Sequence, residues 1–167
     1  MSVITLAGME RSPASSSPPL LRAHLERRPV KDAAAWMLDV AAECARHSTF
    51  NRGIIDYLRA CGLVNQCVIL AADPGGPLTF RFIGIPTMIV MGRAWARQNL
   101  GRPVAQADGT DFGDAMFASY DDAADGTSPV VNRVSLNGLV RPLTYTHSLI
   151  GWRDGAGGRV ILSCVQL

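Results

Sequence analysis

The chain has 167 residues, of which 48% are hydrophobic and 18% are charged. A chain of this size and composition can bury a real core, as one compact domain with extensions. Its 16 Lys and Arg against 14 Asp and Glu give a formal net charge of +2, which is too mild to indicate nucleic acid as a partner.

No apolar run approaches the roughly 20 residues that a membrane-spanning helix needs, and the longest, Ile83 to Met91, contains Gly84 and Pro86. The first residues lack the basic and apolar regions of a secretory signal. The cysteines are scattered through apolar stretches without metal-ligand spacing, as expected of free thiols in a reducing compartment. We therefore expect a cytoplasmic protein without a membrane span and without a metal site.

The N-terminal region divides into two parts. Residues 1–19 are predicted to form a flexible tail, because Arg11 to Pro19 carry too little apolar surface to offset the entropy of ordering them. The basic stretch from Leu20 to Lys31 has leucines at near-helical spacing and predicts a short surface helix. Its positive charges are interpreted as a solvated face, with an anionic partner as the alternative.

A longer helix is predicted from Ala33 to His47, with Asp32 as its N-cap. Its apolar stripe includes Trp36, Val40 and Cys44. Core packing and contact with a second copy of the chain are equal alternatives for this stripe, so these three residues are the candidate dimer or partner contacts.

A second amphipathic helix follows, with Thr49 or Asn51 as its cap and Gly62 just beyond its end. Residues 20–63 are thus predicted to be an N-terminal helical extension. The main domain is predicted over residues 64–167.

The main domain begins with a predicted hairpin. Cys67 to Ala72 is a continuous apolar run of strand length, and Leu78 to Phe82 alternates apolar with polar residues. Residues Asp73 to Pro77 between them have strong turn chemistry. Two antiparallel strands are therefore expected here.

The hairpin is followed by two short predicted helices and three predicted strands. The first helix contains Met88 to Trp95, and the second runs from Asp111 to Tyr120. Asn137-Gly138 is a strong hairpin turn between the first two of the closing strands. The strands are Val130 to Leu136, Leu139 to Trp152 and Arg159 to Gln166.

Three short motifs carry a resemblance to a known family. They are Arg81 to Gly84, Met91 to Arg93, and Leu100 to Pro103. With them the chain resembles stand-alone bacterial PAS domains, in which a strand ending in Arg-x-x-Gly leads into a helix carrying Phe-Gly and then into a Gly-Arg or Gly-Lys step. Met91 stands where the family often has an aromatic residue. The likeness covers about Cys67 to Leu167.

The resemblance implies an α+β fold, with a five-stranded antiparallel sheet, short helices on one face and N-terminal helices before it. It also implies an interior that can hold a small ligand, a tendency to form homodimers, and a role in sensing or connecting. No cofactor is expected. There is no Asn-Cys-Arg-Phe-like segment for a flavin adduct, and the helix from Asp111 to Tyr120 lacks the His of a haem-binding PAS domain.

The leading functional hypothesis is a single-domain PAS-type signalling protein. No kinase, cyclase or DNA-binding segment fits in the remaining residues, so any output is expected to be delivered by docking to a histidine kinase or a similar regulator. A small apolar ligand in the core would gate that docking. A purely structural interaction module with a filled core differs from this hypothesis only in the cavity.

Candidate ligand-binding residues come from two patterns. Strand alternation places Tyr145 and His147 on one face, where the His could orient a polar ligand or serve only as a satisfied structural residue. Met and aromatic side chains adapt to irregular ligands, and equally well fill a core. Those predicted to line the interior are Phe80, Phe82, Met88, Met91, Trp95 and Phe117.

The competing class is an enzyme. A small hydrolase or isomerase could use His147 as an acid-base group with Asp111, Asp114 or Asp121. The sequence contains no nucleophile elbow, metal-ligand cluster or phosphate-binding loop, since Asp73 to Pro77 lacks a Lys and a following helix. We therefore expect a protein that is not an enzyme.

Overall fold

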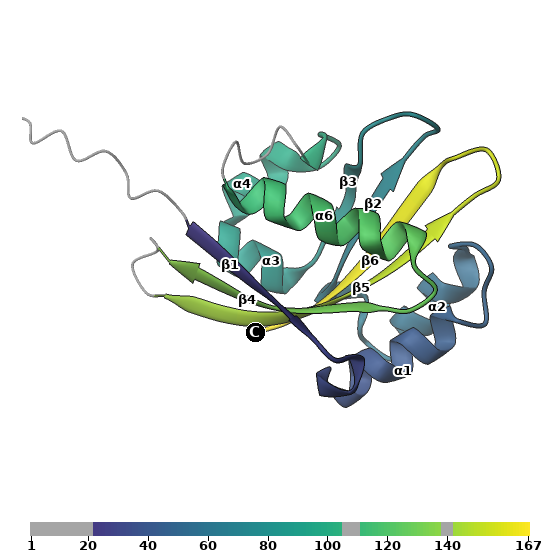
Figure 1. Cartoon of the computed structure of the whole chain (residues 1–167), viewed down its shortest axis with the longest axis horizontal. Coiled ribbons are helices and arrows are strands. Elements are labelled where there is room, and N and C mark those ends of the chain that lie inside the picture. Colours follow the sequence, from purple (N-terminus) through teal and green to yellow (C-terminus); the bar gives the residue numbers. More distant parts are fainter. Residues whose placement is uncertain (1–21, 105–110, 138–141) are drawn as a thin grey trace, which may run out of the picture.

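The computed structural model describes residues 22–104, 111–137 and 142–167. Its centre is a six-stranded antiparallel sheet with the strand order β1-β4-β5-β6-β2-β3 (Figure 1). The strands are β1 (Arg22–Arg28), β2 (Cys67–Ala72), β3 (Thr79–Ile83), β4 (Val130–Asn137), β5 (Leu143–Arg153) and β6 (Arg159–Gln166). The fold is therefore α+β, as expected, and the predicted tail lies outside the described residues.

Helices cover both faces of this sheet. The helices α1 (Ala35–Cys44) and α2 (Arg52–Ala60) lie on one side, which we call the α1 face, and α3 (Ile85–Met91), α4 (Arg93–Asn99) and α6 (Asp111–Asp125) lie on the other, the α6 face (Figure 1). Two 3-10 turns, η1 (Val30–Asp32) and η2 (Val64–Gln66), precede α1 and β2. The expected sheet of five strands is wrong, because β1 adds a sixth; α3, α4 and α6 share one face, and the two helices that precede β2 cover the other.

The basic stretch after residue 20 forms an edge strand, so the helix predicted there is wrong. Strand β1 pairs along β4, with Leu25 opposite Val134 and Arg28 opposite Val131. The leucine spacing fits a helix, but hydrogen bonding to the unpaired side of β4 overrides local propensity. Leu25 packs against the core while Arg27 reaches Asp122 on α6, with Nη2 and Oδ2 2.6 Å apart. The sheet thereby gains a sixth strand with an arginine-rich edge.

The N-caps of the two N-terminal helices, α1 and α2, differ: only that of α2 has a side-chain hydrogen bond. Asp32 is not the N-cap of α1, because it lies in η1, where its Oδ2 accepts a hydrogen bond from Arg28 Nη2 at 3.1 Å; Ala34 holds the cap position without a side-chain bond. Asn51 is confirmed as the cap of α2, since its Oδ1 accepts from the backbone N of Gly53 at 2.8 Å.

The two hairpins predicted from the sequence are present in the structure. Strands β2 and β3 pair as predicted, and residues 101–104 cover the outer edge of β3 through backbone bonds such as Gly101 N to Phe80 O at 2.8 Å. Strands β4 and β5 pair up to Leu136 opposite Leu143, although Gly138 of the predicted turn is outside the described residues. No helix among the described residues is long and apolar enough to cross a membrane.

Backbone contacts fix the helices of the α6 face on the sheet. A Cβ atom at Gly151 of β5 would lie 2.2 Å from the carbonyl oxygen of Ala123 on α6, so α6 touches the sheet at this point. A Cβ atom at Gly84 would lie 2.4 Å from the carbonyl oxygen of Cys67, which fixes the start of α3 against β2. Both positions therefore require glycine.

Candidate functional site

A cavity of about 60 Å³ lies between the sheet and the helices of the α6 face. Strands β2, β3, β5 and β6 form its floor, and α3, α4 and α6 form its walls and roof. A typical site for a drug-sized ligand has about 300–1,000 Å³, and a water molecule takes about 30 Å³. The cavity therefore has room for a few waters or a very small molecule.

Five of the eight predicted ligand-binding residues line this cavity. They are Phe80, Met91, Trp95, Tyr145 and His147. The strand alternation predicted for β5 is borne out, because Tyr145, His147 and Leu149 all pack on the α6 face, whereas Ile150 and Trp152 pack on the α1 face.

The other three predicted residues do not line the cavity. Phe82 and Met88 line an open groove elsewhere, and Phe117 packs on the core with its ring edge against Tyr120, 6.5 Å between ring centroids. For Phe82 the reason is a register shift between Ile69 and Leu70 of β2, which breaks the alternation that would place Phe82 beside Phe80.

Seven further residues of the cavity were not among the predicted ligand-binding residues. They are Val68, Thr87, Val90, Met116, Tyr120, Ser163 and Val165. Strand alternation on β6 could have indicated Ser163 and Val165, since Val165 lies opposite His147 on β5. No sequence pattern indicated Thr87 and Val90 of α3, because a helix of seven residues between Gly84 and Gly92 is too short for its apolar residues to define one inward side.

A buried polar chain closes the cavity at His147. The Nδ2 atom of Asn132 lies 2.9 Å from His147 Nε2 and donates to Ser119 Oγ at 3.1 Å. All three side chains are buried: Asn132 comes from β4, His147 from β5 and Ser119 from α6. Because an amide nitrogen only donates, His147 Nε2 accepts and the ring proton of the neutral imidazole lies on Nδ1.

The environment keeps His147 uncharged. Its complete burial, followed by the nearby positive charge of Arg27, lowers the pKa of His147 from 6.5 to about 3. A general base is most effective with a pKa near the working pH, so a neutral imidazole with this pKa is a weak one. Asp121, one proposed partner, is instead paired with Arg159 at 2.9 Å on the surface. The side chains of Asp111 and Asp114 are outside the description.

Trp95 of α4 lines the cavity, and its indole nitrogen has an unusual environment. Its ring packs edge-on against Phe80, with ring centroids 5.6 Å apart. Its indole nitrogen Nε1 is buried, and within residues 22–104, 111–137 and 142–167 it has no hydrogen-bond partner. Buried N–H groups are nearly always paired in native structures, so this donor requires an explanation.

The predicted dimer contacts are mostly core residues. Val40 and Cys44 are 0% and 2% exposed and pack with Leu162 and Trp152 on the α1 face, so the core-packing alternative holds for them. Trp36 is half-buried and lines an open surface groove instead. The prediction of contact residues is therefore corrected for Val40 and Cys44.

Helix α3 separates the cavity from that surface groove. Its residues Thr87, Val90 and Met91 line the cavity, whereas Ile85 and Ile89 line the groove and are 44% and 67% exposed. The helix has only seven residues and ends at Gly92, whose φ of +92° favours glycine. One short element thus has one side in the cavity and the other at the surface.

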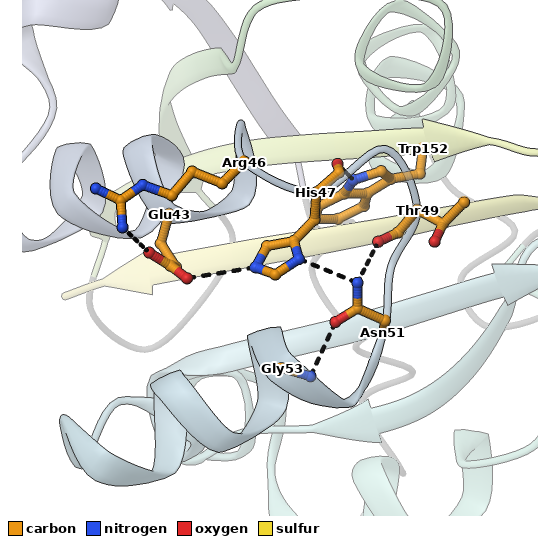
Figure 2. A network of polar contacts seen from close by, with 7 residues as sticks. All are labelled: Glu43, Arg46, His47, Thr49, Asn51, Gly53 and Trp152. Atoms are coloured by element: carbon orange, nitrogen blue, oxygen red, sulfur yellow. Dashed lines mark hydrogen bonds and ion pairs between the residues drawn. The ribbon is translucent and has the colours of Figure 1, made fainter.

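A second polar network lies on the α1 face, where the residues that follow α1 meet β5 (Figure 2). His47 Nε2 lies 3.3 Å from Glu43 Oε1, and its Nδ1 lies 3.1 Å from Asn51 Nδ2. The indole of Trp152 donates to the carbonyl oxygen of His47 at 3.0 Å. Both ring nitrogens of His47 are engaged, and Asn51 also caps α2. We interpret these hydrogen bonds as structural, because they hold the α1–α2 loop against β5.

No cluster of three or more His, Cys, Asp or Glu side chains that could hold a metal ion is found in the described part of the chain. Comparisons with protein-family models, with curated proteins and with solved structures found no match to this chain. The cavity and its walls are therefore the features of this chain that bear on its function.

Proposed function

We propose that this chain is a single-domain sensory protein of the PAS type, which binds a small ligand in the α6-face cavity and signals to a partner protein such as a histidine kinase. The observation that carries the proposal is the cavity itself, lined by five residues that the sequence patterns had indicated. A buried, uncharged polar corner at His147 lies beside mostly apolar walls, which is the usual composition of a small-molecule site.

The order of elements supports the PAS resemblance. From β2 onward the chain has two strands, a helical middle of α3, α4 and α6, and three strands. These five strands pair antiparallel, and the helical middle covers one of their faces (Figure 1). Strand β1 and the α1–α2 pair are additions to that arrangement.

Helix α3 provides a route from ligand to partner. A ligand larger than a few waters must move a wall of the cavity, and α3 is a short wall element with the flexible side chain of Met91. Its movement would reposition Ile85 and Ile89 on the surface. A ligand shifts such an equilibrium only if it binds the displaced form better, so the ligand and the docked partner would be energetically coupled.

Native mass spectrometry of the full chain, beside a denatured sample, tests the proposal. We expect a mass excess that is lost on denaturation and that is absent from Ser163→Leu, in which the larger side chain occupies the cavity. A chain that carries no small molecule, and whose hydrogen exchange in α3 does not respond to any tested ligand, would instead support the filled-core interaction module.

The alternative of a small acid-base enzyme receives little support from the geometry. His147 is uncharged, has a low pKa, and has its Nε2 occupied by Asn132. Turnover of any substrate that is lost in His147→Gln with folding intact would reverse this conclusion.

A further inference from the structure

An open groove between β3 and the helices α3 and α4 combines positive charge with apolar surface. Its volume of about 310 Å³ leaves room for an apolar side chain of another molecule. Its apolar part includes Phe82 and Met88, which are half-buried, and Leu100, which is 54% exposed. The charged residues that line this arginine groove, as we call it, are Arg81 of β3 and Arg93 and Arg97 of α4.

The three arginines of the groove have no acidic partner in the described parts of the chain. Most other arginines do have one: Arg27, Arg153 and Arg159, for example, pair with aspartates of α6. Arg93 and Arg97 are also four residues apart on α4, where like charges repel each other and destabilise a helix. The positive charge of the groove is therefore available to another molecule.

The occupant that fits this groove carries carboxylates around an apolar group. A guanidinium binds a carboxylate through two parallel hydrogen bonds, and here guanidinium groups come from both β3 and α4. A small monocarboxylate would stay largely in water in an open groove, whereas small-molecule sites bury most of their ligand. A second copy of the chain is a poor fit, because the acidic end of α6 is already paired with arginines.

We propose that the arginine groove is the docking site for a short acidic segment of a partner protein, in which Asp or Glu side chains flank a Leu or Phe side chain. This inference rests on the proposed function, for which it names the docking surface and the chemistry of the partner. Helix α4 contributes Trp95 to the cavity and Arg97 to the groove, and Met88 of the groove belongs to α3. The same two helices thus contact both proposed sites.

Three synthetic peptides test the charge and the apolar group separately. The acidic peptide is Gly-Glu-Glu-Leu-Phe-Glu-Glu-Gly with blocked ends; one control has Gln for each Glu, and the other has Ser-Ser for Leu-Phe. Each is titrated at low salt into the ¹⁵N-labelled full chain. We expect the acidic peptide to shift the Nε–Hε resonances of Arg93 and Arg97 in a saturable manner. The Gln peptide should shift neither, and the Ser-Ser peptide should bind about fivefold more weakly, because it buries no apolar side chain.

Two matched variants each remove two positive charges. Arg93→Gln/Arg97→Gln should weaken binding of the acidic peptide by about threefold to thirtyfold, the value of two exposed ion pairs. Arg52→Gln/Arg59→Gln removes the same charge from α2, on the other face of the sheet, and should change the affinity less than about twofold. All four positions are exposed, so both variants should fold.

Several outcomes would overturn the inference. Equal weakening in the two variants, or equal binding of the Ser-Ser peptide, would mean attraction by net charge alone. Failure of the acidic peptide to bind overturns it too. The same holds if vesicles of equal phosphatidylserine and phosphatidylcholine, or an oligothymidylate, bind more tightly than the peptide and in a manner that depends on Arg93 and Arg97, since the partner would then be a membrane or a nucleic acid.

The proposed ligand site is tested independently of the groove. No arginine lines the cavity, so Arg93→Gln/Arg97→Gln should keep the mass excess expected in native mass spectrometry. A mass excess in a chain that does not bind the acidic peptide would overturn the docking inference and support the ligand site. Peptide binding at the groove of a chain that carries no ligand would support the docking surface and favour the filled-core interaction module over the sensor.

Discussion

The two faces of the sheet are built differently. On the α1 face, side chains such as Met37, Val40 and Leu58 are fully buried in a continuous apolar cluster, and burial raises the pKa of the Cys44 thiol to about 12. On the α6 face, a comparable cluster surrounds a cavity, a buried polar chain and the indole N–H of Trp95, for which the described residues offer no acceptor. Close packing stabilises the fold, whereas a void and buried polar groups cost stability. The difference is what the proposed function requires: an α1 face that supports the sheet and an α6 face that has room for a ligand.

The largest expected effect is a loss of stability when a buried side chain of the α1 face is shortened. Leu58 on α2 is fully buried, so Leu58→Ala leaves a void in a closely packed cluster and should lower the free energy of unfolding by about 2–5 kcal/mol. Urea unfolding monitored by circular dichroism measures this loss. Ile89→Ala on the exposed side of α3 is the control and should stay within about 0.5 kcal/mol of the wild type. Equal losses in the two variants would contradict the comparison.

The contact of α6 with the sheet can be tested at one glycine. Gly151→Ala places a Cβ atom 2.2 Å from a backbone oxygen of α6, so one of the two elements must shift, with a loss of about 1–3 kcal/mol. The same substitution at Gly155 meets no atom within 4 Å and should be neutral. Thermal unfolding compares the two. Because α6 forms part of the cavity, ligand binding should also weaken in Gly151→Ala alone.

The buried imidazole of the α6 face should make stability depend on pH. The pKa of His147 is about 3 in the folded chain and 6.5 in an ordinary histidine, so the unfolded chain binds more protons between these values. Stability is therefore lost as the pH falls from 6.5 towards 3, by about 2 kcal/mol at pH 5. Urea unfolding at pH 7 and pH 5 should show this loss in the wild type.

Two variants identify the group responsible. His147→Gln is less stable at pH 7, because it disrupts the bond to Asn132, but it should lack the contribution of His147 to the loss at pH 5. His24→Gln, at an exposed position on β1, should behave as the wild type does. If His147→Gln keeps the full loss at pH 5, the imidazole is not the source of the pH dependence.

The sequence predicted the α6 face better than the edges of the fold. Alternation along β5 correctly placed Tyr145 and His147 on one face, because successive side chains of any strand point to opposite faces of the sheet. It could not predict β1, whose register depends on β4 more than a hundred residues later. The bulge that moves Phe82 away from Phe80 and the inward side of α3 also depend on long-range contacts. The cavity is a property of that packing, which no local pattern contains.

The smallest expected effect comes from placing one larger side chain on each face of the sheet, which tests directly whether the two faces are packed differently. Ser163 is buried on β6 and lines the cavity, so Ser163→Leu fills existing space and should raise the free energy of unfolding by about 0.5–2 kcal/mol while it blocks the ligand. Val131→Ile adds one methylene to a side chain that is buried in the α1-face cluster, and should be destabilising by about 1 kcal/mol.

Opposite signs in these two variants, measured by urea unfolding without ligand, would mean that the α6 face holds a void at a cost in stability. Functional sites commonly carry such a cost, since activity and maximal stability favour different packing. If Ser163→Leu also destabilises the chain, the α6 face is filled as closely as the α1 face. The filled-core interaction module would then explain the molecule better than the sensor does.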